Sequence, residues 1–572
     1  MRVPYRFATL AEAAKVIDPK MPLFCDTETC GFYKKIRLLQ LMQAGWDEVI
    51  LVEWPGDFEV ASFLSFYDSK WHNAHYDITT VQQLTETRWV PKRFDCTFLL
   101  ARLAYPTKEK FDLENVLEYV LGYDPYSKQG LNKKALQKSN WDKLILDEDQ
   151  FLYAATDVFH MPALWEVVKG QVTNQNYTLD KSTLISCLDF QWNGLPVLKD
   201  KIFELYESNE ARIKELNVPI NVNSWQQVRP YIGEDESDDL ALARFSMQGN
   251  TRAKDVREAR KLRKQNSFLD KFDTTDGRIY GKFKPSARSG RLTSNDQNLQ
   301  QLPRATKGVF GYAPEAGRVL IYSDYAQLEL RTICAIVNCL LMEELFREGE
   351  DLHGYTAKMV FGDEWTKQHR QISKTYNFNL LYGGGIDMII TILLKTVGIM
   401  QDQASTYKAR ARWRNLWREI YAWQERGITD WKKGRLGSTP MGRQYKAKMM
   451  TDQLNIENQG AGAEVAKVAL HYLKPELDKV EDVFLANFIH DSFIIDCPDD
   501  PAIYKPIAIL TAEKMQEAWF EMSKLFQIKD LPMPVDVKVG YNWGDIEDDE
   551  VEDVWTYQLE PYAMLEKVNA AS

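Results

Sequence analysis

Acidic side chains that could bind metal ions stand at the end of an apolar run near the start of this 572-residue sequence. In LFCDTET, Asp26 and Glu28 are two positions apart. Residues two apart in a strand project to the same face, so both carboxylates would lie side by side. Two like charges at a buried strand end are costly unless a cation neutralises them. The pair therefore predicts a metal site.

Two later segments add to this pair. HNAHYD provides Asp77 at the start of a helical stretch, and YAATD provides Tyr153 and Asp157, which share one helical face. The four carboxylates could hold two Mg²⁺ ions, which prefer oxygen ligands. Such a metal pair can activate a water and stabilise the leaving oxygen of a phosphodiester, with Tyr153 orienting the water. Any one of these acids alone reads as a solvated surface group, but the ordered set favours the metal site.

FCDTET, HNAHYD and YAATD resemble the three motifs of the DEDD exonucleases, in the subtype with a tyrosine in the third motif. The resemblance spans roughly residues 20 to 165, and Asn73 matches the asparagine that precedes the second motif's aspartate. It implies a ribonuclease-H-like fold and 3′→5′ removal of nucleotides. It also implies that two Mg²⁺ ions are bound by four ligands, Asp26, Glu28, Asp77 and Asp157.

A second pair of acids lies far apart in the sequence. RVLIYSDYAQLELR reads as a strand that ends near Asp324 and is followed by a helix. ANFIHDSFIIDC reads as a hairpin with His490 and Asp491 at its tip. Two aspartates at strand ends could meet on one sheet and share two metal ions.

Between these acids, QHRQISKTYNFNLLYGGG predicts a helix with two different faces. One stripe recurs every four residues and combines cations with aromatics: Arg370, Lys374, Phe378 and Tyr382. A second, apolar stripe could pack in the core: Ile372, Tyr376 and Leu380. Cations followed by aromatics suit a nucleoside triphosphate, with phosphates at one end and base and sugar at the other. The alternative is a plain amphipathic helix with Phe378 in the core.

These segments resemble family A DNA polymerases, the family of bacterial DNA polymerase I and of T7-like phage replicative polymerases. SDYAQLELR matches motif A, RQISKTYNFNLLYG motif B and IHDS motif C. SGRLTSNDQNLQQLP, DLH and NIENQG match further family segments, and the resemblance runs from about 180 to 544. It implies a right hand of thumb (about 178–300), palm (about 301–340 and 436–545) and fingers (about 341–435).

The resemblance also implies roles in the polymerase reaction. Asp324 and Asp491 correspond to the catalytic ligands of two Mg²⁺ ions. Arg370 and Lys374 correspond to residues that grip the triphosphate, with Lys374 a candidate general acid for pyrophosphate, and His353 corresponds to another phosphate contact.

Selection of the nucleotide and contacts with DNA are implied in the same way. Glu329 matches the steric gate against a ribose 2′-OH, and Tyr382 matches the residue at the templating position. Phe378 should favour a 3′-OH sugar over a dideoxy one, because it has no phenol to replace the missing hydroxyl. The primer–template contacts are Arg291, Asn455, Gln459 and His490.

Motif C departs from the family pattern, because Ser492 replaces the usual glutamate. HDSF is similar to motif C of single-subunit RNA polymerases, so an RNA polymerase is one alternative, although Glu329 and the exonuclease motifs speak against it. Two further alternatives for the function are a non-catalytic DNA-binding replisome subunit and a nuclease whose second half only holds substrate. We expect Ser492 to adjust the kinetics without abolishing activity.

Two basic stretches could contact nucleic acid, although the net charge is −11. The stretch at 252–265 is expected to follow minor-groove phosphates of the product duplex, with an ordinary solvated face as the alternative. RARWRNLWR at 410–418 is similarly basic and aromatic and could line the single-stranded template path.

The surrounding sequence indicates the elements that must position these residues. Residues 1–175 alternate strand-like and helix-like runs, which predicts an α/β domain, and the resemblance implies that it is the exonuclease domain. The resemblance implies that 176–572 form the α+β polymerase domain, with an acidic C-terminal tail, 545–572, that is solvated or docks a basic partner. The seven scattered cysteines argue against disulfides and zinc.

The chain as a whole predicts a cytoplasmic protein, because it has no apolar run long enough for a membrane span and no signal peptide. No segment resembles a 5′-nuclease domain, which favours phage DNA replication in a bacterial host. The expected partners are primed DNA template and dNTPs, with a replisome helicase or single-strand binding protein as a candidate.

Overall fold

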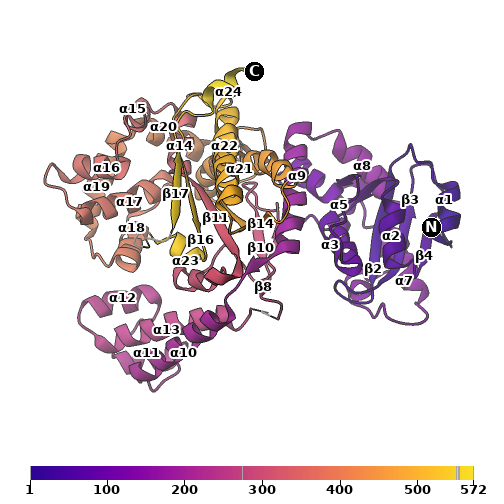
Figure 1. Cartoon of the computed structure of the whole chain (residues 1–572), viewed down its shortest axis with the longest axis horizontal. Helices are drawn as coiled ribbons and strands as arrows, with labels where there is room; N and C mark the ends of the chain where they lie inside the picture. The colour runs from indigo at the N-terminus through magenta and orange to yellow at the C-terminus, as the bar shows by residue number, and fades with distance from the viewer. Residues whose placement is uncertain (1, 273–274, 549–550, 552–553, 571–572) are drawn as a thin grey trace. The chain divides into compact units, whose positions relative to one another are not determined.

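A computed structural model of the chain describes residues 2–272, 275–548, 551 and 554–570. The chain divides into two compact units, Met1–Leu188 and Asp189–Ser572 (Figure 1). The division falls within helix α9 (Asn174–Asn193), slightly beyond the position 175 suggested by the sequence. Among the described residues, no helix is both long and apolar enough to cross a membrane.

The first unit is built on a six-stranded mixed sheet in the order β1-β4-β3-β2-β5-β6. β2 runs antiparallel to β3 and parallel to β5. The strands are β1 (Tyr5–Phe7), β2 (Leu23–Thr29), β3 (Ile36–Met42), β4 (Val49–Glu53), β5 (Asp68–Trp71) and β6 (Arg93–Cys96). The helices are α1 (Leu10–Val16), α2 (Asp57–Leu64), α3 (Ala74–Thr85), α4 (Thr97–Ala104), α5 (Leu113–Leu121), the turn η1 (Ser127–Gln129), α6 (Lys133–Gln137), α7 (Glu148–Phe159) and α8 (Met161–Lys169).

Both faces of this sheet are covered, which explains why successive residues are apolar at the start of β2 and along most of β3. Phe24 and Leu38 belong to one buried cluster, together with Leu152 of α7. Cys25 and Leu39 point the other way and belong to a second buried cluster. Asp26 and Glu28 therefore lie on the α7 side of the sheet, where β2 ends.

The second unit contains a five-stranded antiparallel sheet in the order β14-β15-β11-β16-β17. The strands are β14 (Phe484–Ile489), β15 (Ser492–Pro498), β11 (Arg318–Tyr325), β16 (Val535–Gly540) and β17 (Trp555–Leu559). Helix α22 (Pro501–Ser523) packs on β11, β15, β16 and β17 and also lies against α21 (Met450–Leu477). The sheet corresponds to the expected palm, and its two predicted features, a strand ending near Asp324 and a hairpin with His490 and Asp491 at the tip, are both present.

The expectation of a solvated acidic tail is wrong for the described C-terminal segment. β17 is the edge strand of the palm sheet and pairs with β16, and Val568 of α24 (Leu565–Ala570) is buried. The reason is visible in WTYQL, where alternate side chains are covered, a period-2 pattern that the neighbouring acids concealed. Residues 549–550 and 552–553 of the acidic run lie outside the described residues.

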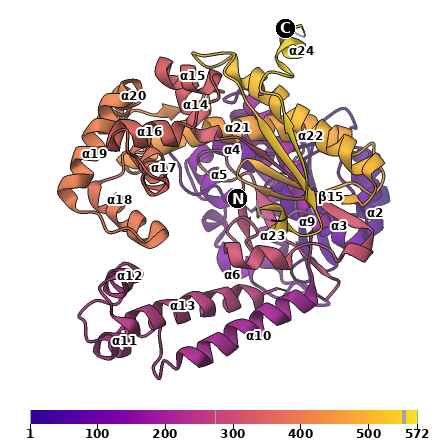
Figure 2. The same cartoon turned by 60° about the vertical axis from the view of Figure 1, so that its left-hand side comes forward.

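Four helices form the expected thumb, and Figure 2 shows α10 and α13 side by side. They are α10 (Lys199–Leu216), α11 (Trp225–Ile232), α12 (Asp239–Met247) and α13 (Thr251–Leu269). The helices after β11 are α14 (Leu328–Val337), α15 (Leu340–Arg347), α16 (Leu352–Phe361), α17 (Lys367–Leu381), α18 (Ile386–Ile392), the turn η4 (Leu393–Val397), α19 (Gln403–Leu416) and α20 (Arg418–Lys432).

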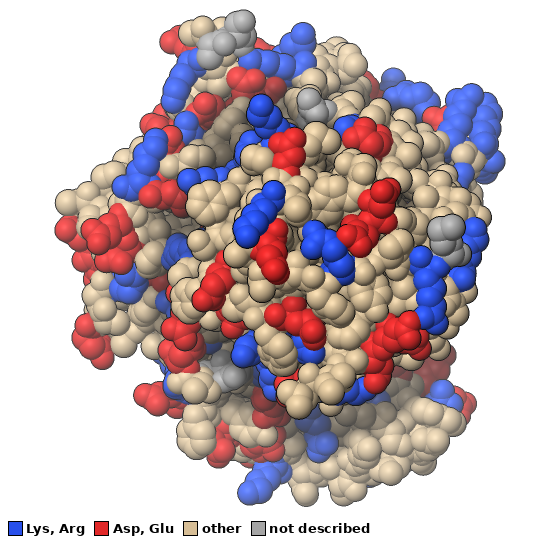
Figure 3. All heavy atoms as spheres, turned by 90° about the vertical axis from the view of Figure 1, so that its right-hand side faces the viewer, with Lys and Arg blue, Asp and Glu red and all other residues tan. Residues whose placement is uncertain are grey.

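Short elements connect these parts. They are β7 (Leu195–Pro196), β8 (Arg278–Ile279), β9 (Lys282–Lys284), β10 (Thr293–Asn295), η2 (Arg304–Val309), η3 (Pro314–Ala316), β12 (Gly437–Ser438), β13 (Gln444–Tyr445) and α23 (Trp543–Ile546). In the part of the chain that the structure describes, the seven cysteines are free thiols, and all but Cys30 are buried. On the face shown in Figure 3, acidic and basic side chains intermingle. The net charge of −11 is therefore not gathered into one acidic patch on this face.

Candidate active sites

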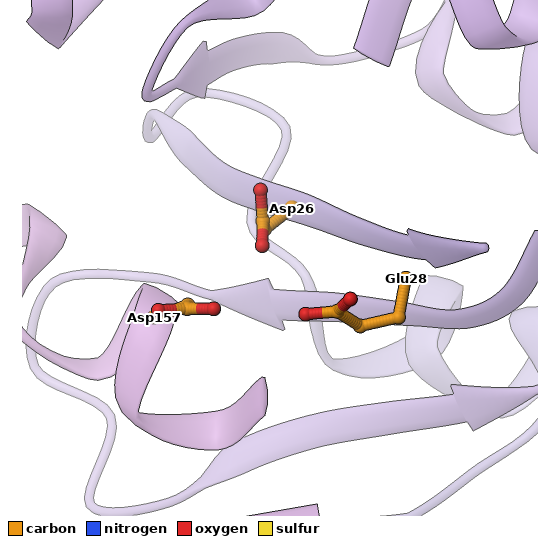
Figure 4. Close-up of side chains that lie close together, drawn as sticks. All are labelled: Asp26, Glu28 and Asp157. Carbon is orange, nitrogen blue, oxygen red and sulfur yellow. The ribbon is translucent and has the colours of Figure 1, made fainter. Parts of the chain in front are cut away.

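Three carboxylates of the first unit converge between β2 and α7. Asp26 and Glu28 come from β2 and Asp157 from α7, and their side chains point toward one another (Figure 4). One oxygen from each lies within 4.8 Å of the others. Helix α7 packs directly on β2, β3 and β4, so the sheet fixes how the groups approach. An all-carboxylate set at this spacing suits a hard divalent cation.

Burial and mutual repulsion raise the pKa of these groups. The pKa values of Asp26 and Glu28 lie well above their usual range, first because the groups are buried and then because other carboxylates surround them. Burial likewise raises the pKa of Asp157. Since each charge destabilises the others, a cation bound among them would remove the repulsion.

Asp77 stands slightly apart from this cluster. It lies in the first turn of α3, which begins after Asn73 in the left-handed conformation. Its Oδ1 accepts a hydrogen bond from the Thr27 hydroxyl at 2.7 Å. Burial raises the pKa of Asp77 to about 7, and its charge raises the pKa of Asp26. The structure thus brings together three of the four predicted ligands and places the fourth beside them.

Two residues that the sequence analysis did not select complete this site. The Tyr126 hydroxyl donates to Asp157, and Lys133 Nζ lies 3.2 Å from that hydroxyl and 4.0 Å from the Asp157 carboxylate. Lys133 is buried and lowers the pKa of both Asp26 and Glu28. Tyr153 is also buried, and the centroid of its ring lies 5.9 Å from that of the Tyr126 ring. In the sequence, NKKALQ looks like a solvated helix and carries no signal of this contact.

The second unit brings two distant acids together at one end of its sheet. Asp324 lies near the end of β11, and Asp491 lies in the tight turn between β14 and β15, next to β11. The pKa of Asp324 is well above its usual range because of burial, then Asp491 and then Asp536. Burial raises the pKa of Asp491 to about 6, and Arg291 opposes this rise.

A third carboxylate, Asp536, was not selected from the sequence. It is the residue of β16 directly opposite Asp324, so the two side chains share one face of the sheet. Ser492, which stands where the family carries glutamate, uses its hydroxyl to bond the Ile489 carbonyl oxygen at 3.0 Å. Motif C thus lacks its usual glutamate, but another carboxylate, that of Asp536 on β16, faces Asp324.

Helix α17 has the two faces that its sequence predicts. Ile372, Tyr376 and Leu380 are buried, whereas Lys374 is exposed and Phe378 is only half-buried. The alternative of Phe378 in the core is therefore not what the fold adopts.

Arg370 and His353 each have a hydrogen-bond partner where α16 and α17 pack together. Arg370 binds both carboxylate oxygens of Asp351 at 2.5 and 3.0 Å. His353 is buried, which lowers its pKa to about 4, so it is neutral at pH 7. Trp413 donates to Oδ1 of Asn377, and Nδ2 of that amide lies 2.9 Å from Nδ1 of His353. Nδ1 must accept this bond, which places the imidazole proton on Nε2.

Glu329 is held from two sides in the first turn of α14. Arg291 Nη2 lies 2.5 Å from its Oε1, and the Tyr382 hydroxyl donates to its Oε2 at 2.8 Å. Asn455 and Gln459 are partly exposed on α21, and His490 is exposed at the hairpin tip. Between the first two lies Asn458, which the sequence analysis did not select and which is fully buried 3.0 Å from the Tyr382 hydroxyl.

The two basic stretches differ in what they leave exposed. On α13, Arg257 binds Asp239 and Arg260 bonds two carbonyl oxygens, while Lys254, Lys261, Arg263 and Lys264 are exposed. In RARWRNLWR, Trp413 and Trp417 are buried. Buried rings cannot stack on bases, so the tryptophans of this stretch serve the core and do not line a template path.

Residues 199–545 match the family model for DNA polymerase family A. This is more than half of the chain, and it contains both palm aspartates, Glu329 and the whole of α17. The chain belongs to DNA polymerase family A. Membership supports template-directed DNA synthesis and weighs against the RNA polymerase alternative raised by HDSF.

Two bacterial DNA polymerases that are similar to this chain differ in how much of their length the similarity covers. The chain is 26% identical to DNA polymerase I of Aquifex aeolicus, covering 93% of the chain and 98% of that protein. It is 32% identical to DNA polymerase I of Deinococcus radiodurans, over 51% of the chain and 31% of that protein. It thus spans nearly the full length of the first relative but about a third of the second.

A solved structure shares the family A fold with this chain. It is described as the POL domain of Pol1 from M. smegmatis in complex with DNA primer-template and dNTP. The TM-score is 0.75 at 17% identity, covering 92% of this chain and 96% of that chain. The likeness confirms the fold class expected from the family A motifs.

Proposed function

We propose that this family A polymerase extends a primer 3′-OH with dNTPs at the palm site and removes 3′-terminal nucleotides at the first unit's site. The observation that carries the synthetic half is the convergence of Asp324 and Asp491 at one end of the palm sheet. The observation that carries the proofreading half is the carboxylate cluster of Asp26, Glu28 and Asp157.

Both carboxylate sets suit Mg²⁺, which prefers oxygen ligands. Asp324 and Asp491 would hold two ions at the palm, and Asp26, Glu28, Asp77 and Asp157 would hold two in the first unit. Bound metals of this kind lower the pKa of an attacking hydroxyl or water and neutralise charge on phosphoryl oxygens. Neighbouring carboxylates raise the pKa values of Asp26 and Asp324, and such ions would remove the repulsion between these groups.

The chain's own residues would position the substrates of synthesis. Lys374 is exposed on α17, where an ammonium group can meet a triphosphate and donate a proton to pyrophosphate. Arg370 would exchange its bond with Asp351 for a phosphate, and neutral His353 would offer Nε2–H. Glu329 would occupy the space of a ribose 2′-OH, which favours deoxynucleotides. Phosphoryl transfer depends mainly on such positioning and charge neutralisation.

In the first unit, Tyr153 would orient the attacking water. The buried Lys133 and the Tyr126 hydroxyl would keep the Asp157 carboxylate ionised and in place.

The proposed partners are primed DNA and dNTPs, which agrees with the ligands named for the M. smegmatis structure. Arg291, Asn455, Gln459 and His490 would contact the primer–template. A helicase or single-strand binding protein, a cytoplasmic site and a role in phage replication stay predictions.

Primer extension with Mg²⁺, comparing dNTPs, rNTPs and no nucleotide, tests both halves. We expect extension with dNTPs and primer shortening without nucleotide. Asp491→Ala should abolish extension but keep shortening, and Asp157→Ala should do the reverse. The exposed Glu481 and Glu118 provide matched controls as Glu481→Ala and Glu118→Ala. Full synthesis by Asp491→Ala would overturn the palm assignment, and extension with rNTPs alone would restore the RNA polymerase alternative.

A further inference from the structure

Asn458 is a fully buried polar residue of the second unit. It lies on α21, and buried neighbours on the same helix include Leu454 and Ala461. A buried amide is unfavourable unless its donors and acceptor all find partners, whereas an aliphatic side chain would fill this position without that requirement. The choice of asparagine therefore needs a reason in its contacts.

Asn458 forms hydrogen bonds with Glu329, the proposed steric gate, with Tyr382, which bonds Glu329, and with Thr332 on the helix of Glu329. We call Glu329 and Tyr382 the gate residues. Nδ2 donates to the backbone carbonyl oxygen of Glu329 at 2.9 Å and to the hydroxyl of Tyr382 at 3.0 Å. Oδ1 accepts from the hydroxyl of Thr332 at 2.7 Å. A backbone carbonyl can only accept, so Nδ2 must face Glu329, and this fixes the orientation of the amide.

These bonds close a ring around the gate. Asn458 joins the backbone of Glu329 to the hydroxyl of Tyr382, and that hydroxyl donates back to Oε2 of Glu329 at 2.8 Å. Because the single hydroxyl hydrogen is used on Glu329, Tyr382 accepts from Asn458, and all polarities agree. Burial and the adjacent Glu329 raise the pKa of Tyr382 well above its usual range, which keeps the hydroxyl a donor.

We propose that Asn458 is a positioning residue that sets discrimination against ribonucleotides, because it fixes Glu329 and Tyr382 relative to each other. The inference rests on the proposed role of Glu329 as a gate. A steric gate rejects a hydroxyl only if its carboxylate cannot move aside. Asn458 restrains that carboxylate through both the backbone and the phenol, from a third helix that neither gate residue belongs to.

The test is Asn458→Leu, which keeps the branched shape and the number of side-chain heavy atoms and removes all three hydrogen bonds. We expect the ratio of kcat/KM for a dNTP to that for the matching rNTP to fall about tenfold, mainly because the rNTP value rises. Tenfold is about 1.4 kcal/mol, the size of one net hydrogen bond. A general packing defect would lower both values and leave the ratio unchanged.

Three further variants make the result decisive. Asn209→Leu removes a buried amide in the thumb, where Nδ2 bonds Oδ1 of Asn266 at 2.8 Å, and should leave the ratio unchanged. Tyr382→Phe should lower the ratio by itself, and adding Asn458→Leu should then lower it by less than Asn458→Leu does alone, because part of the effect of Asn458 passes through the Tyr382 hydroxyl. Thr332→Val, a milder change that frees the amide, should lower the ratio less and serves if Asn458→Leu does not fold.

An unchanged ratio in both Asn458→Leu and Thr332→Val would overturn the inference, as would effects of Asn458→Leu and Tyr382→Phe that simply add. Failure of the proposed function would look different. The unmodified chain would then not extend a primer with dNTPs, or would not prefer them to rNTPs.

Discussion

Glu28→Gln removes one charge from the carboxylate cluster with little change of shape. Oxygens of Asp26, Glu28 and Asp157 lie within 4.8 Å of one another. At this distance two unit charges repel by about 3.5 kcal/mol if the effective dielectric constant is about 20. Attraction to Lys133 and partial protonation offset much of this repulsion. We therefore expect the metal-free variant to be more stable than the unmodified chain by about 1 to 3 kcal/mol.

The measurement is unfolding in EDTA and in Mg²⁺, together with digestion of single-stranded DNA. Mg²⁺ should stabilise the unmodified chain more than the variant, because binding to the folded state adds stability that increases with the logarithm of the affinity. Nuclease activity should fall sharply in the variant. Activity would thus decrease while stability in EDTA increases, an outcome that general damage to the fold cannot produce.

The effect should also depend on pH with a definite sign. The pKa values of Asp26 and Glu28 are raised in the folded chain, so near neutral pH it binds more protons than the unfolded chain. Stability in EDTA is then lost as pH rises from the usual carboxylate range through the raised pKa values, and the advantage of Glu28→Gln should grow as pH rises.

Glu118→Gln makes the same chemical change at an exposed position of α5 and serves as the control. It should alter neither the stability in EDTA nor the response to Mg²⁺. The reasoning is refuted if Glu28→Gln destabilises the chain in EDTA, or if Mg²⁺ stabilises the variant as much as the unmodified chain.

Three other changes have expected outcomes. Asp496→Ala should destabilise the chain by about 3 to 5 kcal/mol in urea unfolding, because Arg278 and Arg318, each 2.7 Å from that buried carboxylate, lose their partner. A decrease in the free energy of unfolding below about 1 kcal/mol would contradict this expectation. Phe378→Tyr should raise incorporation of dideoxynucleotides against dNTPs in a competition assay, whereas an unchanged ratio would speak against the sugar contact. His353 has a pKa of about 4 in place of 6.5, so the folded chain binds fewer protons than the unfolded chain, and stability is lost as pH falls from 6.5 to 4. In unfolding measured at a series of pH values, His353→Gln should reduce this loss by up to about 3 kcal/mol. Equal curves of stability against pH for the two chains would contradict this expectation.

Local periodicity was enough to predict several elements of the two sites. The alternation in β2, the hairpin that presents Asp491 and the two faces of α17 are properties of short segments, and the structure contains all of them. The same reasoning failed for β17, because the acids around it dominate the composition while its alternating pattern covers only five residues.

The missing site residues are those whose role depends on contacts between distant segments. Lys133 reaches Asp157 from a different helix, and Asp536 faces Asp324 from the neighbouring strand. Asn458 meets Glu329 and Thr332 only because α21 packs on α14. Nothing in the spacing of these residues distinguishes them from ordinary polar positions before the fold is known.

Buried polar groups in this chain fall into two kinds, and the difference indicates which of them serve a ligand. Asp496 is a carboxylate with a complete set of partners, since Arg278, Arg318 and the Tyr312 hydroxyl all bond it. Its charge is neutralised within the protein, which is the arrangement of a structural group. Asp26 and Asp324 face mainly other carboxylates, and their pKa values rise for that reason as well as for burial. Because a bound cation would relieve such repulsion, the acids without a neutralising partner, and not the buried acids as a class, support the two reactive centres that we propose.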